Sequence, residues 1–198
     1  MNSLIRIARP DDAAAIAAIY APYVRETAIT FELDVPGDDE MRRRVADVLS
    51  YSTYLVFERD GAIAAYAYGA RFRTRAAYQW SSETTVYVDR SQHGRGIGRA
   101  LYTSLLNCLR VQGFTVAVGV IGLPNAGSVV LHEKMGFKLV GNTRATGFKL
   151  GRWHDVGWYE LALVEPPLNP QPPATLQTLS SDARFQAAMN SGMSTLKA

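Results

Sequence analysis

The sequence predicts a mixed α/β fold in which helices flank one twisted sheet. Three observations support this fold class. Short stretches of alternating apolar and polar residues, typical of strands, are interleaved with longer stretches whose apolar residues recur at helical spacing. The pair Asp60-Gly61 stands between two alternating stretches and is a strong hairpin signal. Glycines gather between Val88 and Leu101, where a strand pattern gives way to a helix pattern. Elements in this order pack in layers around a single sheet.

The first elements follow from local patterns. Leu4 to Ala8 alternates as a strand, and Pro10 suits the first turn of a helix. This helix and a second one from Asp38 to about Leu49 each present an apolar stripe to the core. Tyr54 to Glu58 and Ala62 to about Ala70 then form the predicted hairpin. The inward residues of the two helices are predicted to be Ile16, Ile19, Tyr20, Tyr23, Val24, Met41, Val45, Val48 and Leu49.

The second half alternates strands with helices. A central strand from about Ser82 to Val88 leads through the glycines into a long helix, Gly96 to Gln112. A buried strand, a short helix and two final strands complete the predicted sheet. They are expected at Thr115 to Ile121, from Asn125, near Phe137 to Lys149 and at Trp153 to Leu163.

Composition excludes several classes of partner. Of the 198 residues, 47% are hydrophobic and 20% charged, and the formal net charge is +3, all typical of a soluble globular protein. The run Arg42-Arg43-Arg44 lies in a predicted helix, where such a run is usually a solvated face, so nucleic acid is not an expected partner. No apolar run approaches the roughly twenty residues needed to span a bilayer, and no signal-peptide pattern is present. We therefore expect a cytoplasmic protein that does not bind membranes.

Cysteine and histidine usage adds two expectations. Cys108 is the only cysteine, so no internal disulfide can form, and its place among Leu101, Leu105 and Leu109 predicts a small buried core residue. A reducing cytoplasm fits this usage. The three histidines, at positions 93, 132 and 154, are scattered and have no cysteine or carboxylate at ligand spacing, so no metal site is expected.

The glycines at every other position, Gly94, Gly96 and Gly98, point most directly to a ligand. Without Cβ atoms they let an anion approach the backbone, and the free N–H groups of the following helix point to the same place. We therefore expect an anion cradle that holds a pyrophosphate. A glycine-rich turn that binds no ligand is the alternative.

Two common nucleotide motifs do not fit this run. A nucleoside-triphosphate loop needs Lys-Ser or Lys-Thr after its last glycine, where this chain has Arg99-Ala100. The dinucleotide fingerprint needs a glycine three residues after its second one, and that position is Arg99 or Leu101, depending on the register. The sequence disfavours both kinds of nucleotide site.

The run instead resembles the pyrophosphate loop of the GNAT superfamily of acetyl-CoA-dependent N-acetyltransferases: Gln or Arg, two residues, Gly, one residue, then Gly or Ala. Gly96 and Gly98 fit this pattern, and its first position falls on His93. A second signature follows at the expected separation, in which Asn125 opens a helix that ends in Glu133-Lys134-Met135-Gly136-Phe137. The residue types agree, because Asn125 can cap a helix and glycine suits the left-handed position after one.

Three longer segments are similar to phosphinothricin N-acetyltransferases and to their relatives that act on methionine sulfone and methionine sulfoximine. These segments are Tyr78 to Val88, Val118 to Asn125 and Gly151 to Gly157, within a resemblance that runs from about Ile5 to about Leu163. The resemblance implies the GNAT fold, a mixed central β-sheet flanked by helices, with splayed central strands between which acetyl-CoA slips. It also implies a homodimer.

The chain is expected to divide at about residue 165. Residues 1–165 form the predicted GNAT domain, and prolines at 166, 167, 170, 172 and 173 mark a linker. The remaining residues are small and polar, with a short helical pattern near Leu176 to Met189. We interpret residues 166–198 as an appendage or a partly disordered tail, and packing on a dimer partner is the alternative.

Acetyl transfer from a thioester to an amine needs a base, a stabilised oxyanion and a proton for the thiolate. Glu83 is the candidate base, because a predominantly apolar sheet raises the pKa of a carboxylate. The resemblance places the family's proposed catalytic carboxylate at the same position. A backbone N–H near Val88 would stabilise the oxyanion. His132 follows the phosphinothricin family, whereas many GNAT enzymes have tyrosine there, and it is the candidate acid. A surface role for Glu83 and a structural role for His132 are the alternatives.

Arg71, Arg73 and Arg75 alternate and would project from one face if the strand continued to Arg75. Guanidinium groups bind a carboxylate or phosphinate in a forked geometry, although an exposed basic loop explains the pattern equally well. The resemblance implies substrate contacts at Phe31, Arg73, Arg75, Tyr78, Glu83 and Tyr87. It implies acetyl-CoA contacts at Val86, Tyr87, Val88, Gly94, Arg95, Gly96, Ile97, Gly98, Arg99, Asn125 and Lys134.

These expectations combine into one prediction. The protein is an acetyl-CoA-dependent N-acetyltransferase that acetylates the α-amino group of a small anionic amino acid analogue by direct transfer, without a metal. Phosphinothricin, methionine sulfone and methionine sulfoximine are the leading substrates. Acetylation of peptide N-termini or polyamines is one alternative, although the arginines argue against a polyamine. A non-catalytic acyl-CoA-binding module is the other.

Overall fold

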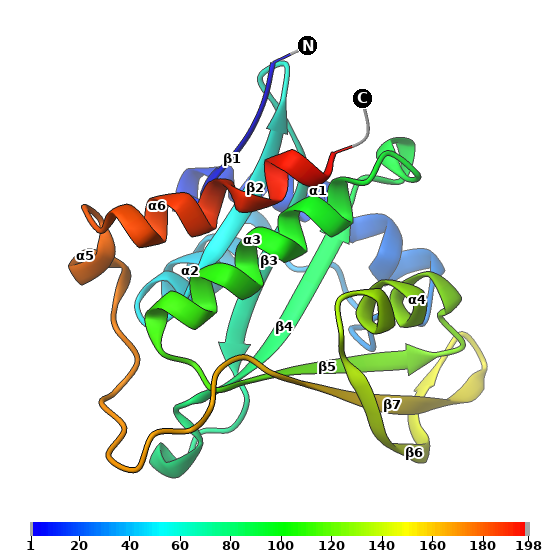
Figure 1. Cartoon of the computed structure of the whole chain (residues 1–198). Helices are drawn as coiled ribbons and strands as arrows, with labels where there is room; N and C mark the ends of the chain where they lie inside the picture. Colours follow the sequence, from blue (N-terminus) through cyan, green and yellow to red (C-terminus); the bar gives the residue numbers. More distant parts are fainter. Residues whose placement is uncertain (1, 197–198) are drawn as a thin grey trace.

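A computed structural model describes residues 2–196 and has the predicted mixed α/β architecture (Figure 1). One seven-stranded sheet has the order β1-β2-β3-β4-β5-β7-β6, and only the central pair, β4 and β5, is parallel. The strands are β1 (Ser3–Ile7), β2 (Tyr54–Arg59), β3 (Ala62–Arg71), β4 (Ser81–Val88), β5 (Val116–Leu123), β6 (Lys138–Lys149) and β7 (Arg152–Ala162). The α-helices are α1 (Ala13–Glu26), α2 (Asp38–Leu49), α3 (Ile97–Gln112), α4 (Ala126–Lys134), α5 (Leu176–Leu179) and α6 (Ala183–Asn190). Short 3-10 helices are η1 (Pro10–Asp12), η2 (Ala76–Tyr78), η3 (Arg90–Gln92) and η4 (Ser191–Thr195).

The predicted hairpin between β2 and β3 is confirmed. Arg59 pairs with Ala62 across the turn. Asp60 and Gly61 have φ angles of 50° and 82°, the left-handed values that both central residues of a tight hairpin turn require.

The prediction that Arg71, Arg73 and Arg75 share one face of a strand is wrong. β3 ends at Arg71, which pairs with Ser82 near the start of β4, so no neighbouring strand remains to extend the ladder. The chain turns instead through η2. The Arg71 side chain stacks on Tyr51, with its guanidinium carbon 3.8 Å from the ring centre, an aromatic contact that holds it apart from any row with Arg73 and Arg75.

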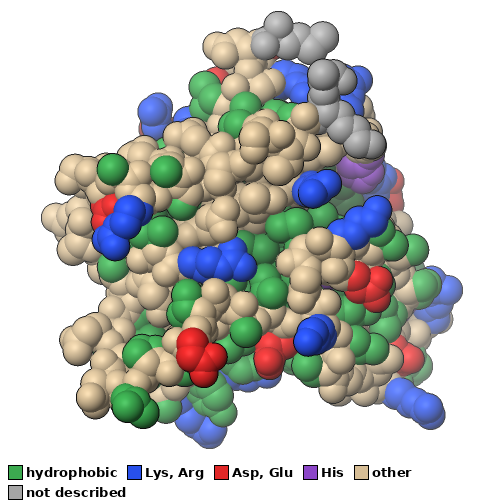
Figure 2. Space-filling model, viewed as in Figure 1, with side chains coloured by type: hydrophobic (Ala, Val, Ile, Leu, Met, Phe, Trp, Pro, Cys, Tyr) green, Lys and Arg blue, Asp and Glu red, His purple; other side chains and the backbone are tan. Residues whose placement is uncertain are grey.

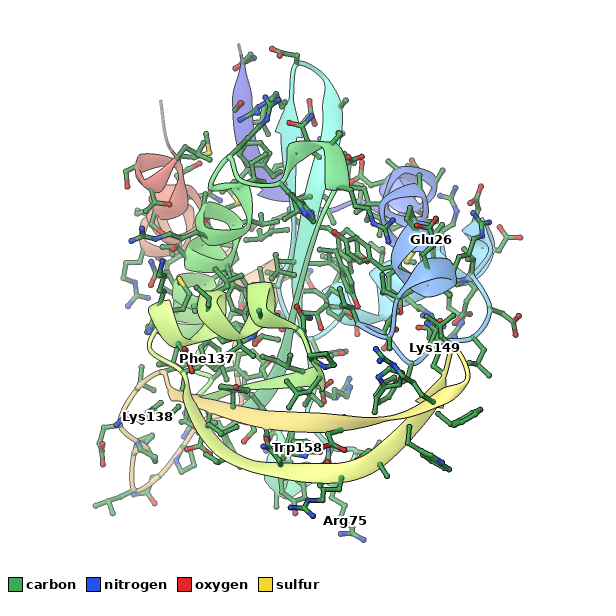
Figure 3. The ribbon with its side chains drawn as sticks, turned by 90° about the vertical axis from the view of Figure 1, so that its right-hand side faces the viewer. Glu26, Arg75, Phe137, Lys138, Lys149 and Trp158 are labelled. Carbon is green, nitrogen blue, oxygen red and sulfur yellow. The ribbon has the colours of Figure 1, made fainter. Side chains whose placement is uncertain are left out.

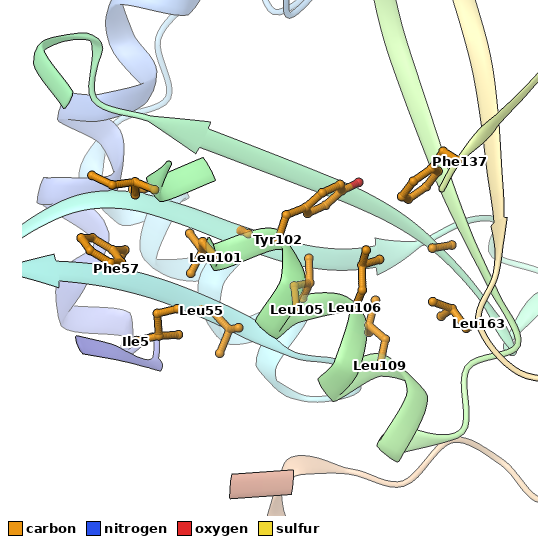
Figure 4. Packing of buried hydrophobic residues seen from close by; sticks show 14 of the residues in the cluster. Ile5, Leu55, Phe57, Leu101, Tyr102, Leu105, Leu106, Leu109, Phe137 and Leu163 are labelled. Carbon is orange, nitrogen blue, oxygen red and sulfur yellow. The ribbon is translucent and has the colours of Figure 1, made fainter. Parts of the chain in front are cut away.

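Two layers of helices cover the sheet, and we name its faces after them. On the α3 face, apolar side chains of α3 pack against strands β1 to β5 (Figure 4). Tyr102, Leu105 and Leu109 are fully buried there. On the α1 face, α1 and α2 pack on β2 and β3, whose contribution includes Tyr54 and Tyr66. Among the helices that the structure describes, none is long and apolar enough to cross a bilayer.

Successive side chains of β4 point to opposite faces of the sheet. Tyr87 packs on tyrosines of the α1 face, and Glu83, two pleats back along the strand, shares that side. Val86 and Val88 pack in the core of the α3 face, and Thr84 reaches the hydroxyl of Tyr102 on the same side. β4 therefore presents different chemistry to each layer.

β4 and β5 separate after a short parallel ladder. Each strand has eight residues, but pairing ends at Glu83 and Val118. The N–H of Asp89 donates to Ala64 of β3, so the odd-numbered residues of this part of β4 bond to β3. The N–H groups of even-numbered residues, including Val88, therefore point into the gap that opens toward β5. The splayed strands that the resemblance implied are confirmed.

The residues after β7 cross back to lie on α3, where α6 and η4 run along the helix (Figure 1). Leu179, Phe185 and Ala188 cover Cys108, and burial raises the pKa of this thiol to about 12. The prediction that Cys108 is a buried core residue is confirmed. On this side of the molecule, basic and acidic side chains are scattered and interspersed (Figure 2).

Candidate active site

The glycine run forms a cradle at the start of α3. Gly94 and Gly96 have φ angles of 78° and 79°, a left-handed conformation that favours glycine. Gly96 is the N-cap and has no side chain that could accept the first N–H groups of the helix. A Cβ on Gly98 would lie 3.3 Å from Val88 Cγ2, so this glycine lets α3 approach β4 closely. The N–H groups of the first turn are therefore available to an anion.

A cavity of about 550 Å³ extends from this cradle to the gap between β4 and β5. Arg99 and Lys134 line it, and none of its described lining residues is acidic, which favours an anionic ligand. All the expected acetyl-CoA contacts lie in its wall except Arg95, which is exposed and outside it. Asn125 belongs to this wall and, as predicted, caps α4 by accepting the N–H of Ser128.

His132, on α4, lies in the same wall and is held at both ring nitrogens. Nδ1 lies 2.8 Å from the carbonyl oxygen of Ser128, and Nε2 lies 3.0 Å from the hydroxyl oxygen of Tyr102. Because a carbonyl only accepts, this bonding assigns the proton to Nδ1, and Nε2 accepts from Tyr102. Burial lowers the pKa of His132 and so favours the neutral imidazole, and the bond to the Ser128 backbone opposes this effect. Tyr102 also hydrogen-bonds Thr84, a further lining residue.

Gly119 of β5 makes room for the His132 ring. A Cβ at this position would lie 2.6 Å from Cδ2 and 2.7 Å from Nε2 of His132, closer than atoms can approach. The absence of a side chain on β5 is therefore a condition for the ring to reach Tyr102.

Glu83 lies on the opposite face of the sheet from His132. It is the last residue of β4 that pairs with β5, and it stands opposite Ala70 of β3. Burial raises the pKa of Glu83, and the positive charge of Arg73 opposes the rise. The predicted raised pKa is confirmed. The two candidate catalytic residues thus flank the gap from opposite faces, and Glu83 itself is not among the residues that line the described cavities.

The loop between β3 and β4 forms a second, smaller cavity of about 160 Å³. Arg73, Arg75 and Tyr78, all expected substrate contacts, line it together with Arg71. The guanidinium carbon of Arg73 also lies 5.7 Å from the ring centre of Trp158 on β7. Figure 3 shows Trp158 and Arg75 toward the same end of the molecule. The structure divides the expected substrate contacts, since Tyr87 lines the larger cavity instead.

Phe31 helps to fix the loop between α1 and α2 on the β6–β7 hairpin. Its ring lies so close to Gly147 that a Cβ there would be 2.4 Å from it. Lys149, beside this loop in Figure 3, donates from Nζ to the carbonyl oxygen of Thr30 at 2.8 Å. Burial lowers the pKa of Lys149, and Glu32 opposes this effect. Phe31 is thus a packing residue of the loop and lies outside the walls of the described cavities.

Sequence reasoning missed the residues that surround the candidate catalytic pair. Tyr102 was hidden in the apolar stripe of α3, and Thr84 is a polar residue in a buried strand, a signal that could have drawn attention to it. His93 turns to Tyr23, with Nε2 2.8 Å from the hydroxyl oxygen, and lies 3.2 Å from the Val88 carbonyl oxygen. A contact of this kind joins residues far apart in sequence and leaves no local pattern.

The geometry agrees with comparisons to known proteins. A family model described as an acetyltransferase (GNAT) domain matches residues 5–158. The chain belongs to the GNAT acetyltransferase family. It is an acyltransferase and uses acetyl-CoA. Among residues 2–196, no group of three or more His, Cys, Asp or Glu side chains is arranged to hold a metal ion.

Several proteins similar to this GNAT chain are named as N-acetyltransferases of particular substrates. It is 38% identical over 168 residues to a phosphinothricin N-acetyltransferase of Streptomyces viridochromogenes, covering 85% of this chain and 91% of the relative. It is 33% identical over 162 residues to an L-methionine sulfoximine/L-methionine sulfone acetyltransferase of Salmonella typhimurium, covering 81% and 95%. A GNAT phosphinothricin acetyltransferase from Sinorhizobium meliloti, solved with acetyl-CoA, matches with a TM-score of 0.81 and 33% identity over 87% of this chain and 97% of its own.

The larger cavity suits the acetyl-CoA that GNAT enzymes use. Its cradle offers backbone N–H groups to a pyrophosphate, and Arg99 and Lys134 add positive charge beside them. At the other end, the N–H of Val88 points into the gap. Side chains at the cradle glycines would disturb this fit, because Gly94 and Gly96 have left-handed φ angles and a Cβ on Gly98 would crowd Val88.

Proposed function

We propose that this enzyme acetylates the α-amino group of a small anionic amino acid analogue, with phosphinothricin, methionine sulfone and methionine sulfoximine as the leading substrates. The observation that carries the proposal is the neighbourhood of Glu83 and Arg73. A carboxyl group with a raised pKa stands where β4 and β5 part, and a guanidinium group acts on it from the loop beside the gap. A base and an anion-binding group side by side suit a substrate that carries an amine and an acidic group. The names of the relatives support the same substrate class.

We propose that the acetyl group is transferred directly, and this arrangement supports the proposal. Acetyl-CoA supplies an activated acetyl group as a thioester. Glu83 would take a proton from the ammonium group of the substrate, directly or through water, so that the free amine attacks the thioester carbon and the carbon–sulfur bond breaks. The N–H of Val88 would stabilise the oxyanion that forms on the way. No acetylated side chain of the enzyme is required.

The thiolate that leaves needs a proton. His132, Tyr102 and Thr84 form one hydrogen-bonded chain, and both of its end residues line the acetyl-CoA cavity. Glu83 takes one of the two protons that the ammonium group loses on its way to the amide, and we propose that the second enters this chain at one end as another leaves it for the sulfur. The chain thus ends with the protons it began with, and no imidazolium is required. This modifies the expectation that His132 alone is the acid.

Thiol release from acetyl-CoA tests the proposal. It would be followed with phosphinothricin, methionine sulfone, methionine sulfoximine, ordinary amino acids, polyamines and short peptides. Saturable release with the three analogues alone supports the proposed substrate class. Release with peptides or polyamines alone would keep the chemistry and reject that class, and tight CoA binding without turnover on any amine would indicate a binding module.

We further propose that the enzyme is a cytoplasmic homodimer. The single cysteine, which is buried as a free thiol, supports a reducing compartment. The β6–β7 hairpin supports a dimer, because it has large apolar side chains that are more than half exposed at both of its ends, and exposed apolar surface is often covered by a partner. They are Leu139, Val140, Phe148, Leu150 and Trp153. Light scattering on the wild type and on a Val140→Glu/Trp153→Glu variant tests this, since a wild-type monomer would reject the dimer.

A further inference from the structure

The segment after β7, residues 164–196, lies beyond the residues that the family model matches, and we call it the C-terminal extension. It docks tightly on α3. The N–H of Gly192 donates to Ser104 Oγ at 3.0 Å, and a Cβ on Gly192 would lie 1.8 Å from the carbonyl oxygen of Ala100. Such close contact along a whole helix makes the extension part of the same packed body (Figure 1).

The first part of the extension reaches the loop that carries Arg73 and Arg75. Trp80, the last residue of this loop before β4, donates from its indole nitrogen to the carbonyl oxygen of Gln171 at 2.8 Å. The carbonyl oxygen of Trp80 accepts the N–H of Thr115 at 2.8 Å. Trp80 is therefore fixed on one side by the sheet and on the other by the extension.

The extension is itself anchored close to this contact. Ala174 donates its N–H to the carbonyl oxygen of Gln112 at 2.7 Å, and Gln112 Nε2 donates back to the carbonyl oxygen of Ala174 at 2.9 Å. Gln112 is buried at the end of α3. The prolines at 172 and 173 restrict the chain between Gln171 and Ala174, so the acceptor of the Trp80 bond has little freedom to move.

The same prolines close the smaller cavity. Its lining includes loop residues, among them Arg73, Arg75 and Tyr78, and Pro172, Pro173 and Thr175 of the extension. Ser50, Tyr51 and Phe114 line it as well. None of the described residues around this cavity is acidic. The arginine side chains therefore line a space that the extension helps to enclose and that no described acidic residue lines.

We propose that the C-terminal extension is a specificity element of the transferase, in which Gln171 and the prolines brace Trp80 and hold Arg73 and Arg75 in position for the acidic group of the acceptor. Trp80 is a positioning residue in this arrangement, since it acts through the loop. The inference rests on the proposed function, because the two arginines matter to turnover only when the acceptor is anionic.

Trp80→Phe tests the brace, because it keeps an aromatic ring and removes only the N–H donor. We expect the KM for methionine sulfone to rise about three- to tenfold, the effect of one lost hydrogen bond. The kcat, the KM for acetyl-CoA and the KM for the neutral amide of methionine sulfone should stay within about twofold. The matched control is Leu168→Ser, in the same extension at a side chain that is 99% exposed. A merely structural role would change all of these parameters together and would overturn the proposal.

A second readout does not depend on turnover. Amide hydrogen exchange of residues 72–79 should be faster in Trp80→Phe than in the wild type, whereas Cys108 should stay unreactive to a thiol reagent because α5 and α6 remain docked. Unchanged exchange with an unchanged KM for methionine sulfone would overturn the brace. If the wild type turns over no amino acid analogue, the proposed function fails, and the exchange experiment alone decides whether the extension holds the loop.

Discussion

The two faces of the sheet meet at one gap but are built in different ways. On the α3 face, the cradle consists of backbone groups that Gly94 and Gly96 and the start of α3 fix within a few residues of sequence. On the α1 face, Glu83 and Arg73 come from different elements, and their relation depends on how a loop packs. A backbone site is specified locally, whereas a side-chain site is specified by tertiary contacts. Substitutions on the two faces should therefore affect different kinetic parameters.

The largest effect is expected on the α1 face. Glu83→Gln should lower kcat by about 10²- to 10⁴-fold, the usual contribution of a positioned general base, and leave the KM for acetyl-CoA within about twofold. Steady-state thiol release with methionine sulfone at pH 8 measures both parameters. Glu160→Gln, at an exposed glutamate of β7, is the control and should behave as the wild type. Wild-type turnover in Glu83→Gln would remove Glu83 as the base.

A substitution in the cradle should have the opposite profile. Gly96→Val forces a β-branched residue into a left-handed conformation with φ near 79° and crowds the first turn of α3. We expect the KM for acetyl-CoA to rise by about ten- to a hundredfold, with kcat at saturation within about threefold. The control is Gly37→Val, because a Cβ on Gly37 would meet no other atom within 4 Å and its φ of -70° suits any residue. An unchanged affinity for acetyl-CoA would place the pyrophosphate elsewhere.

The same difference explains what could be predicted from the sequence. The hairpin, the glycine cradle and the Asn125 cap depend on residue types at short spacing, and the structure confirms them. The prediction for Arg71, Arg73 and Arg75 failed because β4 has only Ser81 beyond Ser82, the residue that pairs with Arg71, and so cannot support a strand that continues to Arg75. The contacts of His132 with Tyr102, and of Trp80 with Gln171, join segments that no local pattern relates.

Gly119 lies against the His132 ring, on the opposite face of the sheet from Glu83, and its substitution should show a smaller effect. Gly119→Ala places a Cβ where the His132 ring lies, so the ring must move and its bond to Tyr102 is lost. We expect kcat to fall by about tenfold, as one hydrogen bond in the proton chain is removed. His132→Gln should add little in the Gly119→Ala background, because both changes break the same chain. Gly141→Ala, at an open position of β6, is the control, and additive effects of the first two changes would contradict the chain.

The smallest expected effect concerns stability and returns to Glu83. Burial raises its pKa in the folded state above the ordinary value of 4.5, so ionisation of Glu83 costs folding free energy. This cost is absent below the unfolded-state pKa, grows as pH rises between the two pKa values and is complete above the folded-state pKa. Glutamine does not ionise, so Glu83→Gln should be more stable than the wild type at pH 8, by up to about 1 kcal/mol or about 2–4 °C in Tm.

Thermal unfolding at pH 8 and at pH 4 measures this difference. The gain from Glu83→Gln should shrink toward pH 4, whereas Glu160→Gln should show no such trend, since Glu160 is exposed. If Glu83→Gln is more stable and less active than the wild type, the wild-type protein gives up stability to keep a buried carboxylate whose raised pKa suits a base. A cradle variant such as Gly96→Val should instead lose stability at both pH values, because its strain does not titrate. A gain that increased toward pH 4 would contradict the raised pKa and, with it, the contrast between the two faces.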